Sequence, residues 1–152
     1  HVIGAKAVAF GEAMTPNYLS YIKQVQSNAK LMSDLLVEKG YDIVSGGTDN
    51  HCMLIDLRSK NLNGKNAEDI LGSVEITVNK NMVPFDTESP FVTSGIRIGT
   101  AAITSRGIKN ENIPQIVSLM DRSLMNSTND DILKAIKGEI HELMASRPLF
   151  EW

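Results

Sequence analysis

Apolar side chains recur at helical spacing in the segment that follows Thr15 and Pro16. The steps between them alternate between four and three residues, which places them on one face of an α-helix. Threonine is a good N-cap, proline is favoured at the first helical position, and Gly40 is suited to end the helix. The sequence therefore predicts one long helix, preceded by an alanine-rich helix end over residues 1–13. The face comprises Tyr18, Ile22, Val25, Ala29, Met32 and Leu36.

The C-terminal third shows two further amphipathic patterns, and residues 65–72 suit a shorter helix. Asn110 is the candidate cap of the first pattern and Asn129 of the second, where two aspartates occupy the favourable first turn. Pro148 is placed to end the second helix. The inward positions are Ile113, Ile116, Val117, Met120 and Leu124 in the first, and Ile132, Leu133, Ile136, Ile140, Leu143 and Met144 in the second.

Four short segments have the character of strands. Residues 41–45 precede the Gly46-Gly47 turn signal, residues 52–57 are apolar on both faces, residues 76–78 are rich in β-branched side chains, and residues 95–99 alternate. Helices with a few short strands predict a two-layer α+β domain whose sheet is mostly antiparallel. A chain of 152 residues that is 42% hydrophobic can bury one core, so we expect a single domain.

Composition narrows the possible partners. The net charge is −3 and charged residues make up 22%, which gives no electrostatic reason to expect nucleic acid or an anionic membrane. No apolar run approaches the roughly 18 residues that cross a bilayer. The single cysteine, Cys52, cannot form an internal disulfide, so a reducing compartment is expected. The chain opens at His1 without an initiator Met and already in a helical pattern, so we expect it to be part of something longer.

The segment from Lys80 to Thr93 lacks a regular pattern. It holds two prolines and polar residues without period, and its phenylalanines and valines make it too apolar for easy disorder. Irregular connections of this length inside a compact domain tend to be functional. A surface loop packed by its own phenylalanines is the alternative, and the pattern alone leaves both open.

Arg97 is the second candidate. On a strand, Ile96 and Ile98 point to one face and Arg97 to the other, while Gly95 and Gly99 allow close approach of a backbone or ligand. A guanidinium there can hold a carboxylate through two parallel hydrogen bonds, which lysine cannot reproduce. A structural salt bridge to one of the chain's 18 acidic residues is the alternative.

Other kinds of site are disfavoured. The three histidines are scattered along the sequence, and adjacent His51 and Cys52 would point to opposite faces of a strand, so no metal site is expected. Residues 45–48 resemble a phosphate-binding loop only loosely because they lack its lysine and its strand-to-helix context. A plain turn is the favoured interpretation there.

Three strings carry a resemblance to a known family. They closely resemble stretches of serine hydroxymethyltransferase in that family's order and spacing, and the resemblance extends from His1 to about Pro148. Ala101 stands where the family commonly has proline, and Met82 where it has serine or threonine. The strings are Ser45-Gly-Gly-Thr-Asp-Asn-His51, Ile76-Thr-Val-Asn-Lys-Asn81 and Ser89-Pro-Phe-Val-Thr-Ser-Gly-Ile-Arg-Ile-Gly-Thr100.

The resemblance implies that residues 1–152 form the small C-terminal domain of a fold-type I pyridoxal-phosphate enzyme, with residues 1–14 the end of the helix leading in from a larger domain. It implies that Arg97 holds the α-carboxylate of the amino-acid substrate. It further implies that Asn81, Ser89, Pro90 and Phe91 contact the folate. By this resemblance, the irregular segment from Lys80 to Thr93 is expected to form part of the folate site.

The implied reaction interconverts serine plus tetrahydrofolate with glycine plus 5,10-methylenetetrahydrofolate, in a cytoplasmic homodimer. The family's Schiff-base lysine lies upstream of the matched part, so we expect no catalytic residue in this chain and no turnover by it alone. Two alternatives stay open: a folate-independent aldolase of the same fold type, and a non-catalytic carboxylate-binding or interaction domain.

Overall fold

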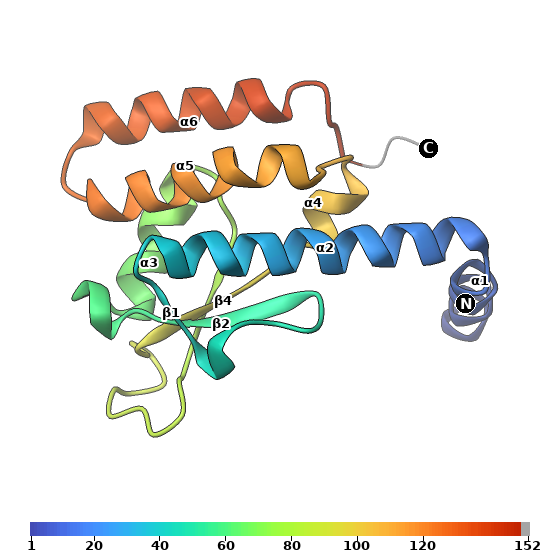
Figure 1. The fold of residues 1–152 in the computed structure, drawn as a ribbon, viewed down its shortest axis with the longest axis horizontal. Helices are drawn as coiled ribbons and strands as arrows, with labels where there is room; N and C mark the ends of the chain where they lie inside the picture. The colour runs from blue at the N-terminus through green and yellow to red at the C-terminus, as the bar shows by residue number, and fades with distance from the viewer. Residues whose placement is uncertain (150–152) are drawn as a thin grey trace.

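A computed structural model describes residues 1–149 of the chain. Within them, six α-helices are combined with one four-stranded sheet (Figure 1). The helices are α1 (Val2–Ala13), α2 (Pro16–Glu38), α3 (Gly64–Ser73), α4 (Ala101–Ser105), α5 (Ile113–Met125) and α6 (Asp130–Met144), and the strands are β1 (Asp42–Ile43), β2 (Cys52–Asp56), β3 (Asn79–Asn81) and β4 (Gly95–Gly99). This is the predicted α+β class.

The helices form layers on one side of the sheet. Helix α2 lies against β1 and β2 and contacts α5, and α6 packs on α5 as an outer layer (Figure 1). Helix α3 packs against β3 and α5. The loop from Met82 to Ser94 extends away from the helices, and α1 projects from the far end of α2. None of the described helices is both long and apolar enough to cross a membrane.

The sheet is antiparallel throughout, with strand order β1-β2-β4-β3. Strand β4 is central to the site because Arg97 pairs with Leu54 of β2 on one side and with Asn79 of β3 on the other. Alternation along β4 buries Ile96 and Ile98 against the helices and leaves Arg97 on the opposite, open face. The predicted orientation of these three residues is confirmed.

The predicted helix faces form the core. Ala29, Met32 and Leu36 of α2 are buried against the sheet, while Ile136 and Ile140 of α6 belong to a second cluster beneath that helix. The face of α2 differs at its start: Tyr18 is exposed, because the first turns of α2 extend past the edge of the sheet beside α1. The core therefore begins at Val25.

Two predicted caps are confirmed and one is wrong. The Thr15 hydroxyl accepts from the Tyr18 amide and the Asn129 side chain from the Ile132 amide. Asn110 does not cap α5. It lies in a 3-10 turn (Asn110–Asn112), and its side-chain oxygen accepts from Gln24 at 2.6 Å, which ties this turn to α2.

The predicted strand over residues 76–78 is also misplaced, since β3 begins at Asn79. Ile76 instead packs between the two apolar clusters and Val78 is buried, so burial rather than sheet pairing accounts for their β-branched character. Of residues 41–45, only Asp42 and Ile43 form a strand before a 3-10 turn. Helix α4 was not anticipated, because five residues are too few to show a helical period.

Buried polar contacts fix the end of β4. The side-chain amide of Asn28, fully buried in α2, donates to the Thr104 hydroxyl at 2.9 Å and to the Ile108 carbonyl at 3.0 Å. The Thr100 hydroxyl, directly after β4, donates to the Val25 carbonyl at 2.8 Å. These bonds hold α4 and the end of β4 against α2, and thereby fix the strand that carries Arg97.

Candidate functional site

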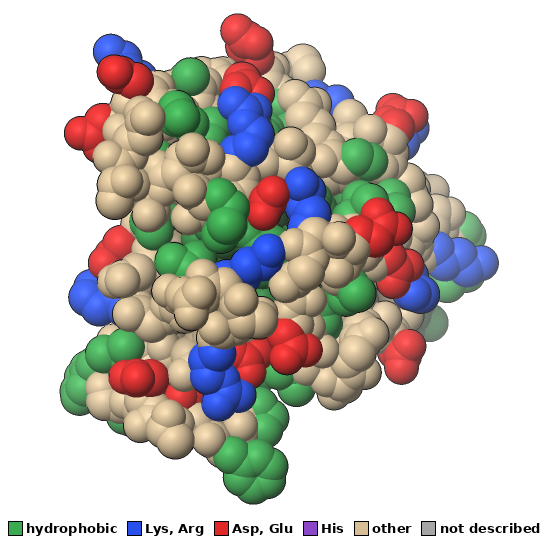
Figure 2. All heavy atoms as spheres, turned by 60° about the vertical axis from the view of Figure 1, so that its left-hand side comes forward, with side chains coloured by type: hydrophobic (Ala, Val, Ile, Leu, Met, Phe, Trp, Pro, Cys, Tyr) green, Lys and Arg blue, Asp and Glu red, His purple; other side chains and the backbone are tan. Residues whose placement is uncertain are grey.

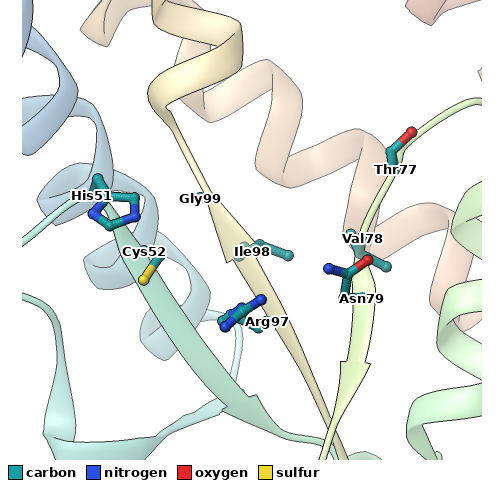
Figure 3. Close-up of a pocket in the computed structure, with 8 residues that line it drawn as sticks. All are labelled: His51, Cys52, Thr77, Val78, Asn79, Arg97, Ile98 and Gly99. Carbon is teal, nitrogen blue, oxygen red and sulfur yellow. The ribbon is translucent and has the colours of Figure 1, made fainter. Parts of the chain in front are cut away.

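The open face of the sheet contains a hollow of about 460 Å³ around Arg97 (Figure 3). In the close-up, Arg97 lies between the His51–Cys52 end of β2 and Asn79 of β3. Three neighbouring chain segments therefore contribute to one surface. The lining residues are His51, Cys52, Thr77, Val78, Asn79, Arg97, Ile98 and Gly99.

The Arg97 guanidinium is exposed and forms no hydrogen bond or ion pair with any residue from 1 to 149. The other four arginines are all engaged. Arg58 and Arg122 bind the carboxylates of Asp56 and Glu139, and two more donate to backbone carbonyls. The structural salt bridge considered for Arg97 is therefore absent from the described part of the chain. What remains is a cation with all of its hydrogen-bond donors available.

Glycines keep the strands beside Arg97 close together. A Cβ atom at Gly95 would lie 2.6 Å from the Ile55 carbonyl oxygen and 2.7 Å from a Val83 methyl group. At Gly99 it would lie 3.1 Å from the His51 carbonyl oxygen. A side chain at Gly95 would clash with backbone, and one at Gly99 would meet the His51 carbonyl tightly, so both glycines suit the close approach of β4 to its neighbours.

The Met82–Ser94 loop, which follows β3 and precedes β4, is held at its base. The amides at the start of α3 donate to its C-terminal end, from Gly64 to the Thr93 carbonyl and from Lys65 to the Val92 carbonyl, both at 2.9 Å. Val83 is buried, whereas the phenylalanines at 85 and 91 are almost fully exposed, at 98% and 81%. A loop packed by its own phenylalanines is therefore wrong.

Of the residues expected to contact folate, one lies directly before this loop and three lie within it. Asn81 is the last residue of β3 and pairs with Gly95, two positions from Arg97 along β4. Ser89, Pro90 and Phe91 lie within the loop and are all exposed. The sheet register thus places Asn81 beside the strand of Arg97, while the other three reach out from the domain.

Comparison with known proteins identifies the family. The sequence model of serine hydroxymethyltransferase matches residues 1–120. This chain belongs to the serine hydroxymethyltransferase family. It is 52% identical over 151 residues to the serine hydroxymethyltransferase of Prochlorococcus marinus (strain MIT 9515), and the match covers 99% of this chain and 36% of that relative. The chain thus spans about a third of the relative's length.

Four residues that share the hollow with Arg97 were not singled out from the sequence as site residues: His51, Cys52, Thr77 and Asn79. Asn79 lies opposite Arg97 only because β3 pairs with β4 in this register. An Asn two residues before Asn81 carries no separate signal in the sequence. Knowledge of the strand pairing is needed to find it.

The hollow around Arg97 has no acidic side chain among its lining residues. No lysine is among the residues that line this hollow, and Lys80, in the neighbouring strand β3, is paired with Glu68 at 3.1 Å. Among residues 1–149 there is also no group of three or more His, Cys, Asp or Glu side chains placed to hold a metal ion. The donor set around Arg97 fits an anion.

Surface charge elsewhere is mixed. On the face shown in Figure 2, acidic and basic side chains are interspersed with apolar ones, and neither sign gathers into a broad patch. The segment at residues 45–48 overlaps a 3-10 turn (Val44–Gly46), and Ser45 and Gly46 in it have φ values of 70° and 71°. It precedes β2 rather than a helix, so the expected plain turn is the better description.

Proposed function

We propose that this chain is the small C-terminal domain of a pyridoxal-phosphate-dependent enzyme that interconverts serine plus tetrahydrofolate with glycine plus 5,10-methylenetetrahydrofolate. The observation that carries the proposal is the Arg97 guanidinium in the hollow of the open sheet face, which has no partner among residues 1–149. Family membership supports it, since a match to serine hydroxymethyltransferase covers most of the chain.

Arg97 binds the α-carboxylate of serine or glycine. A guanidinium forms two parallel hydrogen bonds with a carboxylate, and this pair fixes the orientation of the substrate as well as its position. The burial of Ile96 and Ile98 holds the strand on either side, so the arginine is presented from a rigid element. The mechanism needs this rigidity, because misplacement of a bound substrate by about 1 Å can cost on the order of a hundredfold in rate.

Asn81 and the exposed segment Ser89–Phe91 contact the folate co-substrate. The exposed Phe91 ring offers an apolar surface for a flat heterocycle, and the Asn81 amide offers both a donor and an acceptor. The location of Asn81, in the strand next to that of Arg97, supports one continuous site for serine and folate.

Pyridoxal phosphate is held mainly by parts of the protein outside this chain, in a cytoplasmic homodimer. Helix α1 supports such an arrangement: it is apolar in composition, and none of its twelve residues is buried within this domain. A helix that is hydrophobic all round is normally buried. Residues 1–14 therefore connect to the larger, cofactor-binding domain. Of the proposed domain over residues 1–152, residues 150–152 lie outside the described structure.

The test is to extend the encoding reading frame upstream, express the full protein and assay serine- and tetrahydrofolate-dependent glycine formation. We expect activity in the full protein and none in the 152-residue chain. Borohydride treatment of this chain with pyridoxal phosphate should label no lysine uniquely. Stoichiometric labelling of one lysine, or a full protein without folate-dependent activity, would overturn the proposal.

A further inference from the structure

One carboxylate organises the Met82–Ser94 loop from within. Asp86 accepts four hydrogen bonds. Its Oδ2 accepts from the Val83 amide at 3.1 Å and from the Ser94 amide at 2.9 Å. Its Oδ1 accepts from the Glu88 amide at 3.0 Å and from the Ser94 hydroxyl at 2.6 Å.

These donors lie on both arms of the loop. Val83 is the second residue after β3, whereas Ser94 is the residue directly before β4. A single oxygen of Asp86 therefore joins the entry of the loop to its exit. The Glu88 amide, which donates to the second oxygen, fixes the chain one residue before the exposed segment Ser89–Phe91.

We propose that Asp86 is a positioning residue for the folate co-substrate, which it serves by holding Ser89–Phe91 in a fixed orientation relative to Asn81. This inference rests on the function proposed above. It assigns the role to geometry rather than contact, because the Asp86 oxygens are occupied by bonds within the loop.

The ionised carboxylate is the only aspartate-sized group that suits these four donors. Asparagine has one acceptor oxygen, and its NH₂ group would face two of the four donors. The hydrogen bond from the Ser94 hydroxyl, together with those from the backbone amides, lowers the pKa of Asp86 well below the usual range. The carboxylate therefore stays charged under all ordinary assay conditions.

Arg97 does not depend on this carboxylate. Strand β4 is paired on both sides, with β2 and β3, and its Ile96 and Ile98 side chains are buried in the core. Loss of the Asp86 bonds loosens the loop outside the sheet and leaves the strand in place. Removing Asp86 should therefore separate the two substrates kinetically.

The first test is Asp86→Asn in the full-length enzyme, compared with Asp34→Asn. Asp34→Asn removes the same charge from α2, where the Asp34 carboxylate pairs with Lys30 on the surface. We expect the KM for tetrahydrofolate to rise about ten- to a hundredfold in Asp86→Asn, with the serine KM within about twofold of wild type. Asp34→Asn should leave both KM values unchanged.

A second test needs no activity. In this 152-residue chain, hydrogen exchange at the Val83, Glu88 and Ser94 amides should accelerate in Asp86→Asn, while amides from Val25 to Leu36 keep their protection. Ser94→Ala, which removes the hydroxyl bond alone, should give a smaller acceleration. This variant also keeps the idea testable if Asp86→Asn does not fold.

The outcomes separate the two proposals. A wild-type full protein without folate-dependent activity would refute the proposed function, and the folate role of Asp86 with it. Unchanged exchange in Asp86→Asn would refute the positioning role alone, whatever the activity of the full protein. Equal rises in both KM values, or an unchanged folate KM, would show that Asp86 does not position the folate loop.

Discussion

Polar groups on the two faces of the sheet differ in their burial and in their hydrogen bonding. On the helix side, the Asn28 amide is fully buried and bonded to Thr104, Ile108 and Gln24. Among the described residues, the Ser33 hydroxyl is the one buried side-chain polar atom without a partner. On the open side, Arg97 has no partner from residues 1 to 149. Polar groups of the first kind stabilise the fold, because an unpaired buried polar group is costly; a free, exposed guanidinium contributes little to folding and is available for a ligand.

The contrast predicts a large stability effect on the helix side. Leu36→Ala should lower the free energy of unfolding by about 2–5 kcal/mol, because it leaves a cavity at a side chain that is 1% exposed. Val37→Ala, at the next residue of α2, is the matched control. Val37 is 49% exposed, so its replacement should change the free energy of unfolding by no more than about 0.5 kcal/mol. Urea denaturation of both variants checks this, and similar losses would contradict the assignment of the core.

The boundary between the two faces can be tested with two glycines of α3. A Cβ atom at Gly64 would lie 2.0 Å from the Thr93 hydroxyl oxygen and 2.3 Å from the Gly95 carbonyl oxygen, whereas Gly72 has open space. Gly64→Ala should therefore destabilise by about 1–3 kcal/mol through overpacking. Gly72→Ala should stabilise by about 0.4–1 kcal/mol by reducing the entropy of the unfolded chain. Thermal melts decide; two shifts of the same sign would count against the close contact of α3 with β4.

The smallest expected change concerns pH. Hydrogen bonds lower the pKa of Asp86 in the folded state. Its contribution to the stability of the fold is therefore fully present above the pKa of an unfolded aspartate, about 3.9, and is lost only as the pH falls through the lower folded-state pKa. Amide chemical shifts of Val83 and Ser94 should therefore show no inflection near pH 4 in an NMR titration started at pH 7. An inflection there would mean that the Asp86 bonds are not formed in solution.

The sequence predicts the helical layers well and the site only in part. The long period of α2 and the alternation of Gly95–Gly99 are strong local patterns, and they place Leu36 in the core and Arg97 outside it. Asn79 and Asp86 escape such reasoning. Asn79 depends on the pairing of β3 with β4, and the bonds of Asp86 depend on how an irregular loop folds back on itself. Neither is encoded in a local period.

Spacing alone could not predict that Arg97 lacks a partner among the described residues, although the family resemblance favoured it. The chain contains 18 acidic residues, and only the fold shows that none of those described reaches Arg97. The family resemblance implies the substrate role, and among residues 1–149 the structure shows no salt bridge that would compete with it.

Arg97→Lys in the full-length enzyme tests the central claim most directly, with serine kinetics and melting temperature measured on the same preparation. Lysine keeps the charge but loses the paired hydrogen bonds, so kcat/KM for serine should fall about 30-fold to several thousandfold. The melting temperature should change little, because an exposed arginine contributes about 0–1 kcal/mol to folding. Arg122→Lys, at the Glu139 pair, should leave the kinetics unchanged. Near-normal serine kinetics in Arg97→Lys with a large drop in melting temperature would contradict the role of Arg97 as the carboxylate-binding residue.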